Sequence, residues 1–215
     1  MSLPSKDVLA GYIAKAIELG KGRRFKQSVE LIIVLKDVDI KSQQLKIREV
    51  VHLPRGRGKE AKVCVVCDPD VAESAKEAGA HRVILSSELR ELNKKQAKKI
   101  ASECDWILVK PDLMGTVGKV LGPALGPRGK IPVPMPSGSA VKSLITRYKN
   151  TVLVRIKDQP IIMTTIGSED MNPEDLAENA VAVLSAIEGK LPARFANIGK
   201  LIFKATMGIP VEVSL

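Results

Sequence analysis

Between Ala61 and Asn150, short apolar segments alternate with helical ones, and this rhythm restricts the possible fold more than any other feature. The apolar segments have the length of strands and are AKVCVVC (61–67), HRVILS (81–86) and DWILVK (105–110). Helical spacing occurs over residues 70–80, 88–103, 114–122 and 139–150. Strands that alternate with helices every ~10–15 residues indicate a parallel sheet covered on both faces. The sequence therefore predicts a three-layer α/β domain in the middle of the chain.

The segments on either side of this domain have a different rhythm. A helix begins after Ser5, and a second one begins at Asn172, where we expect an N-cap, and ends at Gly189. Extended segments occupy residues 28–36, 48–53, 151–157, 159–167 and 198–208. We expect an α+β outer domain, with an antiparallel sheet and two helices on one face, from residues 1–57 plus 151–215. The α/β domain, residues 58–150, would be inserted into it.

An insertion of this kind joins the two domains by two linkers, which favours hinge motion. Both predicted joints are polar. The residues that we expect to form the hinge are Arg55, Gly56, Arg57, Gly58 and Asn150.

The net charge of +10 and a pI near 9.6 favour a polyanionic partner such as a nucleic acid. A basic soluble enzyme would have the same balance, so charge alone leaves both readings open. Met1–Asp7 lacks an apolar run, and no stretch reaches the length of a membrane span, so we expect a cytoplasmic protein. Three cysteines are an odd number, which argues against a disulfide framework and for a reducing compartment.

Alternation along the outer-domain strands separates a polar face from an apolar one, because successive side chains of a strand point to opposite faces. The polar positions are Ser28, Glu30, Lys36, Thr151, Arg155, Lys157, Lys200, Lys204 and Thr206. An open face with basic and hydroxyl side chains can contact a phosphate backbone. Ile32, Val34 and Ile202 interrupt this face, and an ordinary solvated face of an antiparallel sheet is the alternative.

Two short segments next to these strands add to the nucleic-acid reading. KGRRFK (21–26) places Arg24 and Phe25 directly before a strand, where Arg can bind phosphate and Phe can stack on a base. Equally, the basic residues could complement the end of a helix dipole, with Phe25 in the core. ATMG (205–208) ends the last strand with a hydroxyl and a glycine that permits close approach of another backbone.

Catalytic, metal and cofactor motifs are not recognised in the sequence. Cys64 and Cys67 have C-x-x-C spacing within a strand, so they point to opposite faces and read as small buried hydrophobes. His52 and His81 have no obvious catalytic company, and GPRGK (126–130) does not match a phosphate-binding loop. KKQAKK (94–99) reads as a solvated helix face, and Asp68 as a helix cap. An enzyme with its active site in the interdomain cleft remains the alternative function.

The stretch VLGPALGPRGKIPVP (120–134) alternates glycine, which permits positive φ, with proline, which fixes φ. It is therefore predicted to be an ordered loop, and its apolar residues are expected to pack on the domain. A protein-interaction module that uses this loop is a third possible function. The stretch resembles the signature loop of the large-subunit ribosomal proteins called L-one, which belong to the mobile stalk. The resemblance covers essentially the whole chain, and LPRGRGKEAKVCVV (53–66) looks most similar to archaeal members.

The resemblance implies a protein that binds large-subunit ribosomal RNA through its outer domain. It implies RNA contacts for Arg24, Phe25, Ser28 and Glu30, and above all for Thr206, Met207 and Gly208. It further implies a transient contact with transfer RNA that leaves the ribosome, repression of translation through the protein's own messenger RNA, and a monomer when free.

Overall fold

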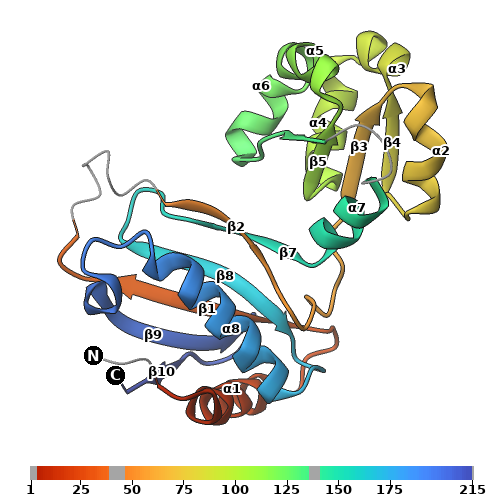
Figure 1. Ribbon diagram of the computed structural model, residues 1–215. Coiled ribbons are helices and arrows are strands. Elements are labelled where there is room, and N and C mark those ends of the chain that lie inside the picture. Colours follow the sequence, from red (N-terminus) through yellow and green to blue (C-terminus); the bar gives the residue numbers. More distant parts are fainter. Residues whose placement is uncertain (1–3, 39–46, 136–140, 215) are drawn as a thin grey trace. The chain divides into compact units, whose positions relative to one another are not determined.

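The computed structural model describes residues 4–38, 47–135 and 141–214 and contains both a parallel and an antiparallel sheet (Figure 1). Its contacts divide the chain into two compact units, Met1–Lys59 with Asn150–Leu215 and Glu60–Lys149. The mixed α/β character expected from the sequence is therefore present. The unit boundaries differ slightly from the predicted insertion of 58–150, because Gly58, Lys59 and Asn150 belong with the first unit.

The first unit is built on an antiparallel sheet of four strands in the order β10-β9-β1-β8. These strands are β1 (Ser28–Leu35), β8 (Ile161–Ser168), β9 (Ile198–Ala205) and β10 (Val211–Val213). Helices α1 (Lys6–Gly20) and α8 (Pro173–Glu188) pack on the sheet, and η4 (Arg194–Asn197) precedes β9. The core lies between the helices and the sheet, where alternate residues of β1 are buried while the intervening ones remain partly exposed.

Local sequence explains these elements. The Ser5 side chain accepts a hydrogen bond from the Val8 amide and caps α1, and Leu9, Ile13 and Ala16 form its buried stripe. Asn172 precedes α8 as predicted, but its side chain makes no capping hydrogen bond. Pro173 and two first-turn acids still favour a helix start there. The last strand is shorter than predicted, because β9 ends at Ala205 and residues 206–208 form a turn.

Residues 151–157 do not join the main sheet, which corrects the single polar face expected from the sequence. Strand β7 (Thr151–Arg155) pairs with β2 (Arg48–His52) in a separate antiparallel ribbon. Thr151 is buried in this ribbon. Arg155 lies directly opposite Arg48, and burial, followed by the charge of Arg155, lowers the pKa of the Arg48 guanidinium.

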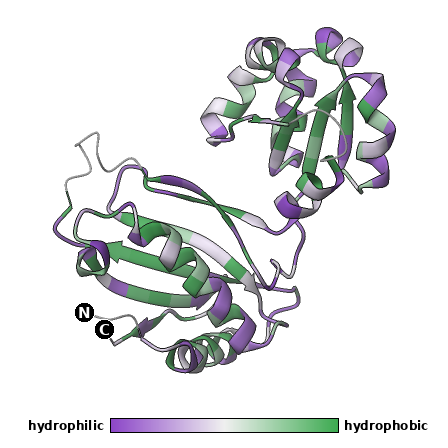
Figure 2. Ribbon diagram, viewed as in Figure 1, coloured by the Kyte–Doolittle hydropathy of each residue, from purple (hydrophilic) through white to green (hydrophobic). Residues whose placement is uncertain are grey.

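The second unit contains a parallel sheet in the order β4-β3-β5-β6, with apolar residues along its central strands (Figure 2). The strands are β3 (Val63–Cys67), β4 (Arg82–Leu85), β5 (Trp106–Val109) and β6 (Val133–Pro134). The helical elements are α2 (Pro69–Glu77), α3 (Ser86–Glu91), α4 (Lys94–Glu103), η2 (Pro111–Leu113), α5 (Met114–Val120), α6 (Gly122–Leu125), η3 (Gly126–Arg128) and α7 (Val141–Lys149).

Two groups of helices cover this sheet. Helix α2 packs with α7, whereas α6 packs with α4 and α5. The chain moves from β3 to β4 in one direction and from β4 back past β3 to β5 in the other. Right-handed crossovers in opposite directions put their helices on opposite faces of a parallel sheet.

The helix predicted over residues 88–103 is two helices. It breaks at Leu92 and Asn93, because the Asn93 side chain accepts from the Gln96 amide while Gln96 reaches back to the Asn93 amide. This reciprocal capping box starts a new helix within a run of otherwise helical spacing. The end of the predicted 139–150 helix at Lys149 is described, whereas its beginning lies outside the described residues.

The glycine- and proline-rich stretch is more regular than the predicted loop. It contains the helical turn α6, the 3-10 turn η3 and the edge strand β6, where Val133 and Pro134 pair with Leu108 and Val109. Proline is tolerated at helix starts and in edge strands, which explains how both turns and the strand form here. Gly129, with φ of +65°, reverses the chain after η3.

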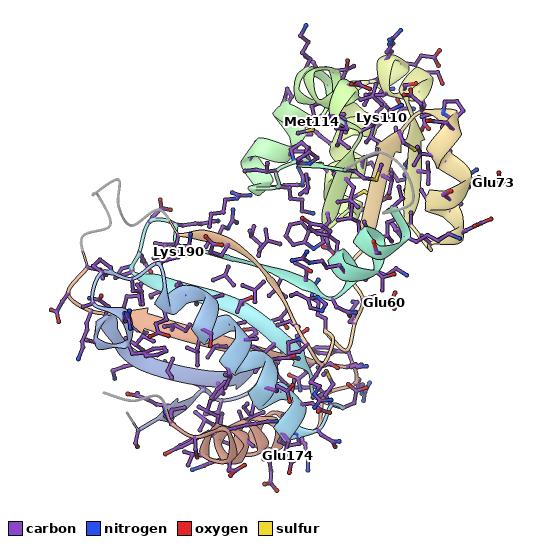
Figure 3. The ribbon with its side chains drawn as sticks, in the orientation of Figure 1. Glu60, Glu73, Lys110, Met114, Glu174 and Lys190 are labelled. Atoms are coloured by element: carbon purple, nitrogen blue, oxygen red, sulfur yellow. A yellow bond between two sulfur atoms is a disulfide. The ribbon has the colours of Figure 1, made fainter. Side chains whose placement is uncertain are left out.

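Asp68 does not cap α2 through its side chain, contrary to the prediction. Its Oδ2 atom instead lies 2.8 Å from the Lys110 Nζ atom, so the two residues that follow β3 and β5 form an ion pair (Lys110 is labelled in Figure 3). Hydrogen bonds from Lys110 and then Ser86 lower the pKa of the Asp68 carboxyl.

Cys64 and Cys104 form a disulfide, which corrects the expectation drawn from the odd cysteine count. Cys104 lies two residues before β5, and β5 pairs with β3, which contains Cys64. The third cysteine, Cys67, is free and buried, and burial together with Asp70 and Asp68 raises the pKa of its thiol. The odd number of cysteines therefore leaves one free thiol and does not prevent the other two from forming a disulfide.

Replacement of Cys64 and Cys104 together by Ala is expected to lower the free energy of unfolding of the Glu60–Lys149 unit by ~2–4 kcal/mol. The bond closes a separation of 40 residues, and its loss gives the unfolded chain more conformational entropy. Urea denaturation with and without a reductant measures the effect. The reductant should destabilise the unaltered protein and a Cys67→Ala control but not the double variant. Detection of three free thiols in the unreduced, unfolded protein would contradict the assignment.

Candidate nucleic-acid interface

The turn formed by Thr206, Met207 and Gly208, here called the TMG turn, follows β9 and lies against the start of β1. The Thr206 amide donates to the Ser28 carbonyl over 3.0 Å, and the Gly208 amide donates to the Ala205 carbonyl over 2.8 Å. The Thr206 Oγ1 atom lies 3.1 Å from the Ser28 carbonyl oxygen and 3.4 Å from the Glu30 Oε1 atom. The fold therefore brings together four residues that the sequence nominated: Ser28, Glu30, Thr206 and Gly208.

Two glycines allow the TMG turn to touch the end of α1. A Cβ atom on Gly208 would come 3.0 Å from the Gly20 Cα atom, and one on Gly20 would come 2.6 Å from the Ala205 Cβ atom. Real Cβ atoms do not tolerate the shorter of these distances, so a side chain at Gly20 would collide with Ala205, the residue directly before the turn.

Gln27 lies buried beneath the TMG turn and fixes it by hydrogen bonds. The sequence did not predict it as part of the site. Its side chain is 1% exposed. Its Oε1 atom accepts from the Met207 amide over 2.9 Å, and its Nε2 group donates to the Gly20 carbonyl over 2.7 Å. The same Nε2 group donates to Glu169 Oε2 over 2.9 Å, and the Gln27 amide donates to Glu169 Oε1 over 2.8 Å.

A signal for Gln27 was present in the sequence. Gln27 is two residues before Val29, so it is in phase with the buried positions of β1 rather than with the polar ones. A polar residue in phase with a buried face needs hydrogen-bond partners within the fold. Glu169, one of those partners, lies far away in the sequence and carries no comparable signal.

Large apolar side chains are exposed around this network. Phe25 is 53% exposed, Met207 is 55% exposed and Ile209 is 60% exposed. Phe25 is therefore not in the core, which answers one of the alternatives left open by the sequence. Ile209 follows the TMG turn directly and was not predicted. These residues provide apolar area on which a ligand can exclude water.

The basic residues of this region differ in their partners. Arg23, rather than Arg24, contacts the turn, through Nη2 at 3.4 Å from the Met207 carbonyl oxygen. Arg24 is exposed, and Lys204 lies opposite Glu30 in the sheet. Lys26 pairs with Asp170 at 2.6 Å, and hydrogen bonds from Lys26 and then Ser168 lower the pKa of the Asp170 carboxyl.

The remaining basic residues nominated by the sequence lie away from the TMG turn. Lys200 is six residues earlier on β9, which corresponds to about 20 Å along a strand, and it pairs with Glu212 at 3.0 Å. Lys36 follows the far end of β1. Arg155 ends β7 of the separate ribbon, and Lys157 follows it two residues later. Both line a hollow of about 430 Å³ together with Asp158, Gln159, Ile161 and Met163.

The open face of the main sheet is apolar in its middle, where the sequence predicted an interruption by Ile32, Val34 and Ile202. Ile32 lies between Met163 and Ile202, and Val34 lies between Ile161 and Lys200. Polar residues dominate only at the end of the sheet that carries Ser28, Glu30, Thr165 and Lys204. The candidate interface is therefore this end of the sheet with the adjoining turn.

Within residues 4–38, 47–135 and 141–214, no group of three or more His, Cys, Asp and Glu side chains could hold a metal ion. In the same ranges, no helix is long and apolar enough to span a membrane.

Comparisons with known proteins agree with the resemblance seen in the sequence. The model of the ribosomal protein L1p/L10e family matches residues 14–209. A protein of Staphylothermus marinus named "Large ribosomal subunit protein uL1" is 56% identical over 99% of each chain. Proteins of the same name from Aeropyrum pernix (54% identity, covering 94% of this chain and 92% of the relative) and Hyperthermus butylicus (48%, covering 100% of each) are also similar. From a match of this length and these identities, it follows that the chain belongs to the ribosomal protein L1p/L10e family.

Proposed function

We propose that this chain is a structural protein of the large ribosomal subunit that binds the ribosomal RNA of the mobile stalk through the TMG turn. The observation that supports this proposal most strongly is that a buried side chain, Gln27, fixes the turn while Thr206, Met207 and Phe25 remain accessible. The names of the relatives support the assignment to the large subunit, and a ribosomal protein functions in the cytoplasm. An enzyme is excluded, because the family consists of ribosomal proteins.

The polar groups of the turn suit recognition of a ribose. The single proton of the Thr206 hydroxyl is directed at the Ser28 carbonyl or the Glu30 carboxylate. The lone pairs of the hydroxyl oxygen and of the carboxylate then accept hydrogen bonds from outside. A ribose 2′-hydroxyl is a donor that RNA has and DNA lacks. Ser28, Glu30 and Thr206 would thereby select RNA in a given backbone geometry, without reading bases.

The exposed apolar side chains make these hydrogen bonds selective. Phe25, Met207 and Ile209 would be covered by the bound RNA and would exclude water from Thr206. A buried polar group without its partner costs ~1–3 kcal/mol. An RNA whose shape fails to supply the partner would therefore bind much more weakly, so the site distinguishes RNA folds.

Charge supplies the remaining affinity. Arg23 contacts the turn, Lys204 lies two residues before it, and Arg24 is exposed next to Arg23 in the sequence. All three would contact phosphates next to the recognised riboses. Lys36, Lys200, Arg155 and Lys157 lie further along the same unit, and we assign them phosphate contacts at the edge of the RNA footprint. Their contributions should be less specific, because Lys200 is already paired with Glu212.

Most of the predicted hinge residues, Arg55 to Gly58, are fixed by hydrogen bonds to other residues of the first unit. The Asn179 side chain donates to the Gly56 carbonyl over 2.8 Å and accepts from the Arg55 amide over 3.0 Å. The Lys26 ammonium lies 3.5 Å from the Gly58 carbonyl oxygen. A hinge would therefore pivot after Gly58 and at Asn150, rather than throughout residues 55–58.

A messenger RNA that presents the same backbone shape would compete for the TMG turn. We therefore include repression of the protein's own messenger RNA in the proposed function. It requires no second specific site, since shape recognition of riboses and phosphates does not depend on base identity. A transient contact with departing transfer RNA is also included and is assigned to the Glu60–Lys149 unit, because bound stalk RNA would occupy the TMG turn.

Thr206→Val is expected to weaken binding to the stalk segment of large-subunit ribosomal RNA by about 10-fold or more, because a hydrogen bond in a water-excluded site is lost. The slope of log affinity against log salt should stay the same, since the threonine side chain is uncharged. Filter binding or calorimetry at several salt concentrations measures both quantities.

Thr206→Ser keeps the hydroxyl and should retain most of the affinity. Thr146→Val, on the exposed face of α7, is the matched control outside the interface. Equal binding of the stalk RNA and of unrelated RNA by the unaltered protein, unaffected by Thr206→Val, would refute the proposed site.

Gln27→Met preserves the size of the side chain but leaves the Met207 amide and the Gly20 carbonyl without their partner. We expect a loss of unfolding free energy of roughly 1–3 kcal/mol for each group left unsatisfied. RNA affinity measured well below the melting temperature should fall as well, since the turn loses its fixed position. Gln159→Met, in a surface segment of the same unit, is the control. Unchanged stability would show that the turn does not depend on Gln27.

A further inference from the structure

Helix α4 of the second unit carries four exposed lysines, Lys94, Lys95, Lys98 and Lys99. At 3.6 residues per turn, they occupy an arc of about 140° on one side of the helix. Ala97, Ile100 and Ala101 occupy the other side and are buried. The four residues are called the lysine stripe below.

The placement of these charges opposes the stability of the helix. Lys94 and Lys95 lie in the first turn, where the helix dipole is positive, and the first turn contains no acidic residue. Lys94 and Lys98, like Lys95 and Lys99, are four residues apart, a spacing at which like charges repel. Even the capping box uses the neutral residues Asn93 and Gln96. A helix under selection for stability alone would carry acids at these positions.

Little compensates for the repulsion. Lys99 lies 3.9 Å from the Glu103 carboxylate and is 72% exposed, so this ion pair is weak. In the part of the chain that the structure describes, Lys94, Lys95 and Lys98 lie within 4.0 Å of no carboxylate. At the other end of α4, the Lys130 ammonium donates to the Ala101 and Cys104 carbonyls over 3.0 and 2.6 Å. A fifth cation, Lys130, thus occupies the C-terminal end of α4, where the helix dipole is negative and would favour a positive charge.

The stripe has the chemistry of a phosphate-binding surface rather than of a protein interface. Every residue of α4 outside the core is polar, so the stripe contains no exposed apolar anchor. The centres of protein interfaces are depleted of lysine and rich in aromatic residues. Lysines without apolar neighbours can instead bind the backbone of a nucleic acid through charge alone.

Resting on the proposed function, we infer that the lysine stripe is a second RNA-contacting surface, which binds phosphates of the same stalk RNA that the TMG turn recognises. The two surfaces have different tasks. The turn selects the fold of the RNA through uncharged groups, and the stripe adds salt-dependent affinity from the second unit. The fold keeps the stripe at a cost to the stability of α4.

The test replaces all four lysines by Gln, which has nearly the same helix propensity. Binding to the stalk segment of large-subunit ribosomal RNA is measured over a range of salt concentrations. The salt slope should fall by about 0.7–0.9 for each lost phosphate contact, with binding about 10-fold or more weaker near 0.1 M salt. The melting temperature of the unit should rise by a few degrees, on the order of the shift that ~1 kcal/mol produces.

A control with the same change of net charge replaces Lys6, Lys15, Lys76 and Lys142, which are exposed on other helices. Loss of affinity in the stripe variant alone, with preserved preference for stalk RNA, supports the inference. Equal affinity and salt slope in the stripe variant and the unaltered protein would overturn it, as would an equal loss in the control. Failure of the proposed function looks different, because Thr206→Val would then have no effect and the unaltered protein would show no preference for stalk RNA.

Discussion

The hydrogen bonds of the buried Gln27 side chain hold together the part of the molecule on which the proposed recognition depends. This one amide satisfies the carbonyl at the end of α1, the amide of Met207 and a carboxylate oxygen of Glu169. Three segments that are distant in the sequence thus meet at one buried group, and the contact of Gly20 with Gly208 lets them approach closely enough. Because Gln27 takes up the polar groups on the inside, Thr206 can present its oxygen outward.

Under the proposed function and the further inference, the two units would use different physical means to attract the same RNA. In the first unit, some basic residues are paired with acids, as in the pairs Lys26 with Asp170 and Lys200 with Glu212. Specificity there would come from hydroxyl and carboxylate oxygens beside exposed apolar side chains. In the second unit, α4 concentrates positive charge without matching acids. Short-range recognition and longer-range attraction would thereby be separated, so that one could change without loss of the other.

Sequence periodicity predicted both classes of sheet and most of the buried faces, because burial imposes a period of two on strands and of about 3.6 on helices. Periodicity gave wrong predictions where a single side chain determines the local backbone conformation. Asn93 breaks an apparently continuous helix, and proline starts short turns in a stretch that reads as a loop. The structure brings together Ser28, Glu30, Thr206 and Gly208, which the sequence had proposed one by one as RNA contacts. Arg155, Lys157 and Lys200 were nominated with them, because periodicity gives the face of a strand but neither its sheet nor its partners.

What the sequence determined by itself was therefore the pattern of apolar and polar positions, the placement of glycine and proline, and membership of a family. Only the tertiary structure decided which distant residues meet. Strand pairing brought Cys64 to Cys104 despite an odd cysteine count, and it separated β7 from the main sheet. It also made Gln27 the centre of the site, since a buried amide is satisfied only by groups that folding brings to it. The physical reason is the same in each case: periodicity is a local property of the chain, whereas hydrogen-bond partners, disulfides and sheet neighbours are fixed by long-range packing.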